Sequence, residues 1–556
     1  MTNDRGIFVL TAVRKILYKL TYLDKYPDID ISMSGSNIGA RRKRNIRDHL
    51  FIIHGVINSV IQGEDTCIDI QVYDLEQAFD ALWLEDTLND LYDALPDHAR
   101  DDKLALVYET NISNLVAVNT PAGQTERVSI PTIVQQGSGW GPMQCSVSVD
   151  KIGKMAKERG VHQYLYKGLV RVLPLACVDD LLGFATCGNK SVALNTFINT
   201  HIELKKLRFH TPSISGKTKC HKLHIGKSNK LCPELRVHGH PMRVVECEKY
   251  LGDFISSTGA NTETIRNRVS IGNGIIAKIR SILENMSLGK HYFKIAFLLR
   301  ESLFLNGILY SSEAWYGLKT SEIADLEKVD IILLRNIFEV PQSTPTVSLY
   351  LESGCVRIRN ILKARRINFL HHLANLEKEE MEYKFFKAQW DYPCPKDWTL
   401  QVKQDLADLG LPISLQFLTS KSEKNFKELV KVKVKELEFK ELMGQRNSKS
   451  KNIMYETLKL QNYLELDTAS KKQAIILFKF RTRMSPFGEN FRSGKQSTIC
   501  PFCLSHVDSQ EKSMDCPTLR KELRINGNYQ DLFSKDIPVE LVQTLFDIYA
   551  YRKENE

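Results

Sequence analysis

The 556-residue sequence contains no long apolar run, because no stretch approaches the roughly 18 consecutive apolar residues of a membrane-spanning helix. Its first residues, Met-Thr-Asn-Asp-Arg-Gly, lack the form of a secretory signal peptide. Internal repeats and low-complexity tracts are also missing. The first two absences argue against a membrane-embedded or secreted protein and predict an intracellular one. The third gives no sign of a repeat architecture.

The composition is that of an ordinary folded protein, with 43% hydrophobic and 26% charged residues. A chain of this length is expected to form roughly three or four domains. The net charge of +10 favours a polyanionic partner. Because lysine and arginine are spread along the whole chain, any basic face must be built by folding. The 12 cysteines are scattered, some of them inside apolar runs, and most are expected to be reduced core thiols.

Three aspartates at two places are the most informative feature of the sequence. Asp74 follows the run Ile-Asp-Ile-Gln-Val-Tyr, and the pair Asp179 and Asp180 follows Leu-Ala-Cys-Val. Because apolar residues lead up to the acids in both places, we expect each carboxylate at the tip of a buried strand. An isolated Asp-Asp pair is most often a solvated turn. The second acid-tipped strand upstream favours a metal site instead.

Carboxylates that converge on rigid strands provide the oxygen ligands that Mg²⁺ prefers. A pair of such ions, about 3.5–4 Å apart, holds the attacking and leaving oxygens of an in-line displacement. Asp74, Asp179 and Asp180 therefore predict a two-magnesium site of the kind used in phosphoryl or nucleotidyl transfer.

The spacing of apolar residues predicts an α+β first half and a helical second half. Helical spacing occurs over residues 7–22 and 49–61, on either side of a Gly/Ser loop and a basic cluster, and again near 143–157. A predicted strand then turns at the acid pair into a second strand, which makes an antiparallel hairpin. Residues 261–375 read as successive amphipathic helices, and a polar linker over 443–452 precedes a last domain.

Taken together, the motifs resemble those of a reverse transcriptase, and the best match is the type that non-LTR (LINE-type) retrotransposons encode. Five motifs stand in the family's order: Tyr-Asp-Leu-Glu-Gln-Ala-Phe-Asp at 73–80, Gln-Gly-Ser-Gly-Trp-Gly-Pro at 136–142, Cys-Val-Asp-Asp at 177–180, Gly-Lys-Thr-Lys at 216–219 and Tyr-Leu-Gly at 250–252. The similarity covers most of the chain, from the Arg5 segment to the C-terminal cysteines. Five motifs in order are far more specific than any one of them.

The resemblance implies an α+β, right-hand polymerase fold in five parts. These are partial fingers over residues 1–60, a palm with an antiparallel sheet as the reverse transcriptase catalytic domain over 61–257, a helical thumb over 258–380, a helical connector and polar linker over 381–455, and a small C-terminal domain with a degenerate zinc-knuckle-like motif over 456–556. No endonuclease of the kind common in the family is visible. The chain is therefore expected to be the polymerase and tail of a longer element protein, truncated at its N-terminus.

The resemblance also implies catalytic roles. Asp74 and Asp179 would hold two Mg²⁺ ions, with Asp180 as a further ligand or a nearby charge. The ions would activate a primer 3′-hydroxyl and neutralise charge on the triphosphate. Lys219 corresponds to the lysine that protonates pyrophosphate in relatives, a role that needs a positioned donor. Lys217, two residues earlier, is the alternative.

Other matched positions concern the incoming nucleotide. Phe79 corresponds to the steric gate that excludes a 2′-hydroxyl, with an ordinary core aromatic as the alternative. The glycine loop with Gln136 and Gly137 suits close approach of the backbone to a nucleotide. Cys177 departs from the family, which usually has an aromatic there. That change is expected to tune activity without abolishing it, because the metal ligands are intact.

Two basic positions and one hairpin complete the match. Arg5 and Arg41 correspond to cations that face the triphosphate or the template strand, with solvated surface arginines as the alternative. Tyr250, Leu251 and Gly252 correspond to the hairpin that grips the primer end.

The C-terminal cysteines also depart from the family pattern. Cys500, Cys503 and Cys516 match the cysteines of the family's zinc knuckle, but Glu511 stands where the histidine belongs. His506 is the other nearby candidate, at a spacing unlike the family's. Closed structural zinc sites are usually built from cysteine and histidine. The segment is expected either to bind Zn²⁺ or to be a metal-free tail with ordinary thiols.

The leading hypothesis is RNA-directed DNA synthesis, in which a DNA 3′ end is extended on an RNA template with dNTPs and Mg²⁺, with the nucleus as the site of action. RNA-directed RNA synthesis would share the aspartates, but Phe79 argues against it, because such enzymes need a polar residue that accepts the 2′-hydroxyl. A catalytically impaired, nucleic-acid-binding remnant is the third hypothesis. The intact aspartates argue against it, while the missing start and Glu511 keep it open.

Overall fold

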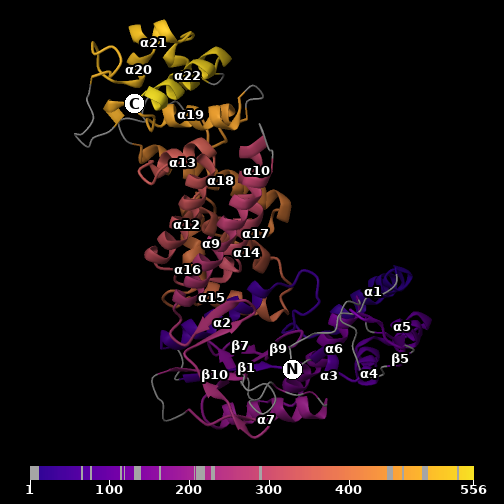
Figure 1. The fold of residues 1–556 in the computed structure, drawn as a ribbon. Coiled ribbons are helices and arrows are strands. Elements are labelled where there is room, and N and C mark those ends of the chain that lie inside the picture. Colours follow the sequence, from indigo (N-terminus) through magenta and orange to yellow (C-terminus); the bar gives the residue numbers. More distant parts are fainter. Residues whose placement is uncertain are drawn as a thin grey trace. The chain divides into compact units, whose positions relative to one another are not determined.

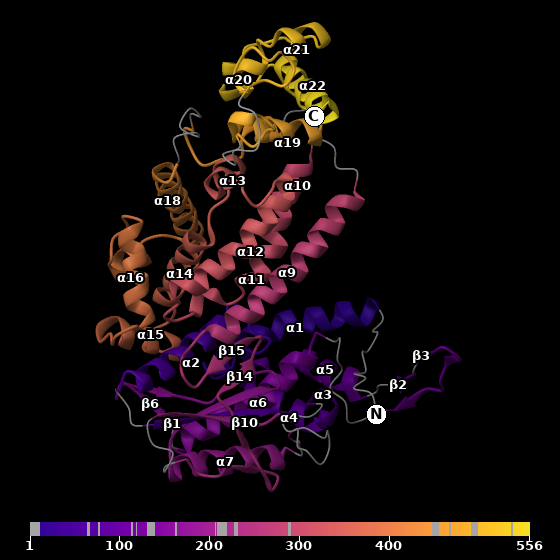
Figure 2. The ribbon, with the colours of Figure 1, turned by 60° about the vertical axis from the view of Figure 1, so that its left-hand side comes forward.

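The fold is given by a computed structural model (Figures 1 and 2), which describes residues 12–63, 67–75, 78–112, 115–117, 119–129, 139–161, 164–205, 207, 209, 219–226, 232–286, 291–446, 455–465, 469–490, 499–534 and 537–555. The chain forms two compact units. The sheet unit comprises Met1–Glu263, Ala314–Gly317 and Leu373–Gln401, and the helical unit comprises Thr264–Glu313, Leu318–His372 and Val402–Glu556. The five-part division expected from the sequence is finer than these two units and stays a prediction.

Among the described residues, the main sheet of the sheet unit has five strands. They lie in the order β13-β10-β1-β9-β8, and neighbouring strands are antiparallel except β10 and β13, which are parallel. The bounds are Cys67–Asp74 for β1, Leu175–Cys177 for β8, Asp180–Thr186 for β9, His221–Gly226 for β10 and Arg243–Val244 for β13. The expected α+β class and the antiparallel hairpin at the acid pair are therefore confirmed.

Strand β1 is buried on both faces until its last residue. Its isoleucines and valine point to one face, because side chains alternate along a strand. Polar side chains on the other face are tied to α7 (Asn189–Leu204), where Gln71 Nε2 donates to the Ser191 carbonyl oxygen at 2.9 Å. Tyr73 OH donates in turn to Gln71 Oε1 at 2.6 Å. The polar groups of this face are thus satisfied inside the protein, as burial requires.

Helices complete the sheet unit. The expected helices over 49–61 and near 143–157 correspond to α2 (Ile46–Ile61) and α6 (Gly141–Glu158). α1 (Ala12–Ser32) continues well beyond the expected end at residue 22. Trp140, at the start of α6, donates from Nε1 to Thr21 Oγ1 at 3.1 Å and joins α1 to α6 in one apolar cluster. Among the described residues, the other α-helices of this part of the unit are α3 (Ala78–Ala81), α4 (Leu84–Ala94), α5 (Asp102–Ile112) and α15 (Met381–Asp391).

Short strands pair outside the main sheet. The pairs are β2 (Leu115–Val116) with β5 (Val128–Ser129), β3 (Asn119–Thr120) with β4 (Gly123–Gln124), β6 (Tyr164–Tyr166) with β7 (Val170–Val172), β11 (Arg236–Val237) with β12 (His240–Pro241), and β14 (Cys247–Tyr250) with β15 (Asp253–Ser256).

The helical unit is built mainly of helices (Figure 2). They are α9 (Thr262–Asn285), α10 (Tyr292–Leu299), a π-helical turn (Arg300–Leu305), α11 (Asn306–Ile308), α12 (Thr320–Phe338), α13 (Thr346–Ser353), α14 (Ile358–Ala374), α16 (Trp398–Asp408), α17 (Leu415–Thr419), α18 (Glu423–Gly444), α19 (Lys471–Arg481), α20 (Gln510–Ser513), α21 (Pro517–Glu522) and α22 (Val539–Asn555). Across the described ranges of the chain, none of the helices combines the length and the apolarity that crossing a bilayer requires.

Buried ion pairs tie the helices of this unit together. Arg300 donates to both carboxylate oxygens of Asp330, at 2.7 and 2.6 Å, and Tyr350 OH donates to the same carboxylate at 2.9 Å. Arg366 Nε donates to Asp405 Oδ2 at 2.6 Å. Removing one partner of such a pair leaves a buried charge alone, which is strongly destabilising. These arginines therefore serve the packing of the unit.

Candidate active site and metal centre

The strand register brings the predicted carboxylates together. Asp74, the last residue of β1, lies directly opposite Asp180, the first residue of β9. Directly opposed residues of an antiparallel pair have Cβ atoms about 4.5–5.5 Å apart and point to the same face. Asp179 immediately precedes Asp180. The three aspartates, more than 100 residues apart in sequence in the case of Asp74, therefore meet at one end of the sheet.

A tight turn fixes the position of Asp179 and Asp180. Cys177 of β8 pairs with Asp180 of β9, which leaves Val178 and Asp179 as the two-residue connection. Val178 has a φ of 60°, a left-handed conformation that is strained for a β-branched residue. Two-residue hairpins usually place glycine at such a position. The β8–β9 ladder and the packing of Val178 against the core hold this strained turn in place.

Negative charge accumulates at the end of the sheet. Burial, together with the charges of Asp179 and Asp74, raises the pKa of Asp180 to about 7, although Lys219 lowers it. A carboxyl whose pKa stays raised by burial and like charges has more negative charge around it than Lys219 offsets. Hard carboxylate oxygens grouped in this way are the donor set that Mg²⁺ prefers. The residues present therefore fit a divalent cation.

Lys219 lies at the same carboxylates. Its Nζ is 3.0 Å from Asp74 Oδ2, and its side chain remains half-exposed. The residue precedes β10, whose register against β1 carries the chain toward the end of β1 where Asp74 stands. The structure thus brings Lys219 to the acid cluster, while the alternative Lys217 lies outside the described residues.

The predicted nucleotide contacts fall partly on described residues. Phe79 lies on α3, partly buried against the core cluster that contains Tyr73. This packing matches the core-aromatic alternative and leaves the gate role a prediction. Gln136, Gly137 and Arg5 lie outside the described residues.

The side chain of Arg41 is only 5% exposed and is held by hydrogen bonds within the protein. Its Nε donates to Asp30 Oδ1 at 2.7 Å, and Nη2 donates to the Asp30 carbonyl oxygen at 2.8 Å. Nη1 donates to the carbonyl oxygens of Ser34, at 2.7 Å, and Asn37, at 3.0 Å. These contacts hold the guanidinium against the protein, and a contact of Arg41 with a triphosphate or the template stays a prediction.

The hairpin predicted to grip the primer lies beside the carboxylates. Tyr250 and Asp253 pair across the β14–β15 turn, in which Leu251 and Gly252 have φ of 48° and 83°. Positive φ at both central residues is the geometry of a type I′ turn. Burial raises the pKa of Tyr250, and the neighbouring charge of Asp180 raises it further. Tyr250 is thus an electrostatic neighbour of the acid cluster.

Sequence reasoning missed the anchor of this hairpin. Asp253 is buried, and its Oδ2 accepts a hydrogen bond from Trp315 Nε1 at 2.8 Å. Trp315 belongs to the short segment Ala314–Gly317 that clusters with the sheet unit, although the sequence places it in the predicted thumb. No local signal could have found this pair, because the two residues are distant in sequence and neither belongs to a recognisable motif.

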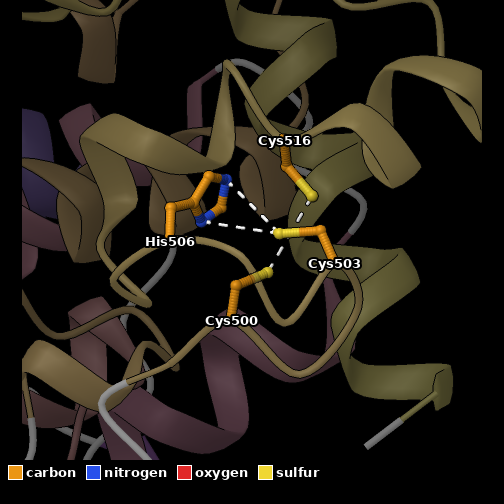
Figure 3. A group of neighbouring side chains, drawn as sticks. All are labelled: Cys500, Cys503, His506 and Cys516. Atoms are coloured by element: carbon orange, nitrogen blue, oxygen red, sulfur yellow. Dashed lines mark hydrogen bonds between the residues drawn. The ribbon is translucent and has the colours of Figure 1, made fainter.

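A second constellation lies in the helical unit (Figure 3). The ligand atoms of Cys500, Cys503, His506 and Cys516 all lie within 4.8 Å of one another. Cys500 Sγ and Cys516 Sγ are 3.9 Å apart, and Cys503 Sγ is 3.6 Å from both ring nitrogens of His506. Two sulfurs bound tetrahedrally to Zn²⁺ at about 2.3 Å are about 3.8 Å apart. The four side chains are thus already spaced for a Cys₃His site.

His506, and not Glu511, completes this group. The Glu511 carboxylate instead pairs with Arg483. The loop from Cys500 to His506 is closed by a hydrogen bond from the Cys500 N–H to the His506 carbonyl oxygen at 2.9 Å, and the imidazole faces the Cys503 thiol (Figure 3). The spacing is Cys-x₂-Cys-x₂-His-x₉-Cys. The spacing of the family's zinc knuckle places its histidine at position 511. His506 lies only three residues after Cys503, so the sequence interpretation treated it as the less fitting candidate.

Hydrogen bonding favours the thiolate form of Cys503, the form that binds a metal. Burial raises the pKa of the Cys503 thiol, but hydrogen bonds from the Ser505 hydroxyl and backbone, and from the neighbouring thiols, outweigh it and lower the pKa to about 6. Burial raises the pKa of Cys500 to about 11. The thiolate is the form that ligates metals. The donor set of three thiols and one imidazole fits Zn²⁺.

Comparisons with known proteins add little to this geometry. No family model matches the chain, and no curated protein matches it. Among solved structures, the chain is similar to a telomerase of Candida albicans in complex with the TWJ fragment of telomeric RNA, with 12% identity and a TM-score of 0.27 over 68% of this chain and 57% of that chain. An apo telomerase of Candida tropicalis matches with 12% identity and a TM-score of 0.28 over 68% of this chain and 60% of that chain. The chain thus spans less than two thirds of each telomerase chain, and at such TM-scores only its own geometry bears on function.

Proposed function

We propose that this chain is an RNA-directed DNA polymerase of the type that non-LTR retrotransposons encode, extending a DNA 3′ end on an RNA template. The observation that carries the proposal is the register of β1 and β9, which sets Asp74 opposite Asp180 with Asp179 adjacent. Asp180 and Tyr250 are electrostatic neighbours, so the hairpin proposed to hold the primer lies beside the same acids. The aspartates of two motifs that resemble this family thus meet where β1 ends and β9 begins.

The proposed catalytic roles follow from the positions of the side chains. Asp74, Asp179 and Asp180 would hold two Mg²⁺ ions, which supply activation of the primer 3′-hydroxyl and neutralisation of the triphosphate. Lys219, whose Nζ is 3.0 Å from Asp74 Oδ2, would give a proton to the leaving pyrophosphate. The β14–β15 turn, anchored through Asp253 and Trp315, would hold the primer end rigidly against the acids.

The remaining assignments complete the proposal. Phe79 would exclude a 2′-hydroxyl, and the loop with Gln136 and Gly137 would lie along the incoming dNTP. Arg5 and Arg41 would face the triphosphate or the template. The net charge of +10 supports RNA and DNA as partners, and we place the site of action in the nucleus, where the DNA to be extended lies. Partial fingers, palm, thumb, connector and C-terminal domain keep the bounds given by the resemblance.

We also propose that the Cys₃His group binds Zn²⁺ as a closed structural site. Four ligands with no open position are typical of structural zinc, which contributes directly to folding. The ion would join the loop that carries Cys500, Cys503 and His506 to the start of α21, where Cys516 stands.

Primer extension on poly(rA)/oligo(dT) tests the polymerase proposal. The full chain with Mg²⁺ should extend the primer with dTTP and not with UTP. Asp179→Asn should lower the rate by at least about 100-fold, the loss typical of removing one group that stabilises transition-state charge. Glu126→Gln, at an exposed acid, is the matched control and should extend like wild type. Binding of template and primer without Mg²⁺-dependent extension would favour the non-catalytic remnant.

A further inference from the structure

The sheet unit holds another group of metal-ligating side chains, away from the acid cluster. Asp69 lies on β1, Cys187 directly follows β9, and His224 lies on β10. One ligand atom from each lies within 4.8 Å of the others. The group therefore spans three adjacent strands of the main sheet.

The register shows that this group is separate from the proposed magnesium site. Asp69 is directly opposite His224, and the Cys187 N–H donates to the Cys67 carbonyl oxygen at 3.4 Å, which extends the β1–β9 ladder by one residue. Side chains alternate between the faces of a strand. Asp69 therefore points to the face of α7, while Asp74 and Asp180 point to the opposite face.

The distances fit one cation among the three ligands. Cys187 Sγ is 3.5 Å from His224 Nδ1 and 3.7 Å from Asp69 Oδ1. Ligands bound tetrahedrally to Zn²⁺ at about 2.3 Å for sulfur and 2.0–2.1 Å for nitrogen or oxygen are about 3.5 Å apart. His224 Nδ1 and Asp69 Oδ1 are closer, at 2.8 Å, because a proton lies between them. A cation would replace that proton, with the imidazole N–H moved to Nε2, and would displace the thiol proton of Cys187 to solvent.

Hydrogen bonds on the α7 side of Asp69 fix the orientation of its carboxylate. Ser191 Oγ, on α7, donates to Asp69 Oδ2 at 2.6 Å, and Gln71 Nε2 donates to Ser191 Oγ at 2.9 Å. This leaves Oδ1 toward Cys187 and His224. Hydrogen-bonded partners behind a ligand are a regular feature of protein metal sites, since they fix the ligand's orientation. Asp69 itself is completely buried.

We propose that Asp69, Cys187 and His224 form a second transition-metal site, of the Zn²⁺ class, that cross-links β10, β1 and β9. One thiolate, one imidazole and one carboxylate form a mixed donor set that suits zinc better than magnesium or calcium. A fourth position remains for water. The site would stabilise the two strands whose other ends carry Asp74 and Asp180, whether or not the chain polymerises DNA.

Zinc content of the full-length protein, measured by mass spectrometry after dialysis against a zinc buffer, tests this site. Cys187→Ser should lose one zinc per chain relative to wild type. Cys232→Ser is the matched control, because Cys232 contacts Lys222 Nζ at 3.1 Å next to the group without belonging to it, and should lose none. Combining Cys187→Ser with Cys503→Ser should remove one zinc more than either change alone if both sites are occupied. Equal zinc in Cys187→Ser and Cys232→Ser, with both folded by circular dichroism, overturns the proposal.

A second variant decides the matter if Cys187→Ser fails to fold. His224→Cys keeps a ligand at the same place and should retain the metal. With Co²⁺ as the probe, in a Cys503→Ser and Cys516→Ser background, it should show stronger thiolate-to-cobalt absorption than the parent. No cobalt–thiolate absorption in the folded parent background would also overturn the proposal.

Discussion

A single buried carboxyl in the sheet unit links stability to pH. Glu382 on α15 is completely buried, and its nearest cation is the Arg44 guanidinium, with Nη1 at 3.5 Å. Burial raises the pKa of Glu382 to about 7, although Arg44 pulls it down. The folded state therefore holds this proton more tightly than the unfolded chain does. The free energy of unfolding must then fall as pH rises from about 4.5 to about 7.

Glu382→Gln should remove this pH dependence. Between pH 4.5 and 7 the wild-type protein loses up to about 3 kcal/mol through this group, at about 1.4 kcal/mol per pKa unit, and the variant should not. The variant should therefore melt higher than wild type at pH 8 and nearly together with it at pH 4.5. Thermal melts followed by circular dichroism across this range measure the difference. Glu379 is an exposed glutamate of the preceding turn, and the melting temperature of Glu379→Gln should depend on pH as that of wild type does. The same pH dependence in Glu382→Gln would refute the assignment of the raised pKa to Glu382.

The residues whose meeting the sequence predicted correctly belong to local motifs. Asp74, Asp179 and Asp180 follow apolar strands, and that pattern was enough to predict that they meet. Arg41 and Glu511 were not predictable in the same way, because each side chain is fixed by partners that no motif names. Arg41 is held by the Asp30–Asn37 segment, and Glu511 by Arg483.

At the scale of elements, turns in the left-handed conformation decide where helices and strands can end. Gly354 terminates α13 with a φ of 68°, and a Cβ there would collide with the backbone of Lys459 and Leu460. Gly410 follows α16 with a similar φ of 64°, but a Cβ there meets no atom of the described residues within 4 Å. A substitution at Gly410 would therefore add only backbone strain, whereas one at Gly354 would add backbone strain and a steric collision.

Gly354→Ala should destabilise the helical unit by more than about 3 kcal/mol, because it adds a backbone collision to the roughly 1–2 kcal/mol of a left-handed alanine. Gly410→Ala should lower the free energy of unfolding only by the roughly 1–2 kcal/mol of a left-handed alanine. Urea unfolding followed by helical circular dichroism measures both. If Gly354→Ala is no less stable than Gly410→Ala, the backbone around Lys459 can move aside with no loss in the free energy of unfolding.

Helices were easier to foresee than pairings between distant strands. Apolar periodicity located α2 and α6 to within a few residues, since it is a property of the segment itself. The parallel pairing of β13 with β10 and the recruitment of Ala314–Gly317 to the sheet unit have no such signal. They depend on contacts that form only after the chain has folded. The five-part polymerase division therefore stays a prediction.

Within the complete chain, the proposed Cys₃His zinc should stabilise only the segment that carries its ligands. Cys503→Ser removes a ligand from a site of a kind that contributes about 10–16 kcal/mol of binding free energy to folding. Amide hydrogen exchange of residues 499–522 should therefore accelerate by at least about 100-fold, while that of β1 should not change. Cys355→Ser, at a cysteine of the same unit outside the cluster, is the control. Unchanged exchange in Cys503→Ser would mean that the segment is ordered without metal.

Metal binding by the aspartates is the central claim, and a Mn²⁺ titration tests it most directly. The full chain would be mixed with an RNA template, a primer that lacks its 3′-hydroxyl and the matching dNTP, and free Mn²⁺ followed by electron paramagnetic resonance. Two ions should bind to wild type, as two-metal transfer requires. Asp74→Asn should lose them, and Glu126→Gln should keep them. If Asp74→Asn binds Mn²⁺ as wild type does, the paired carboxylates of β1 and β9 are not a polymerase metal site.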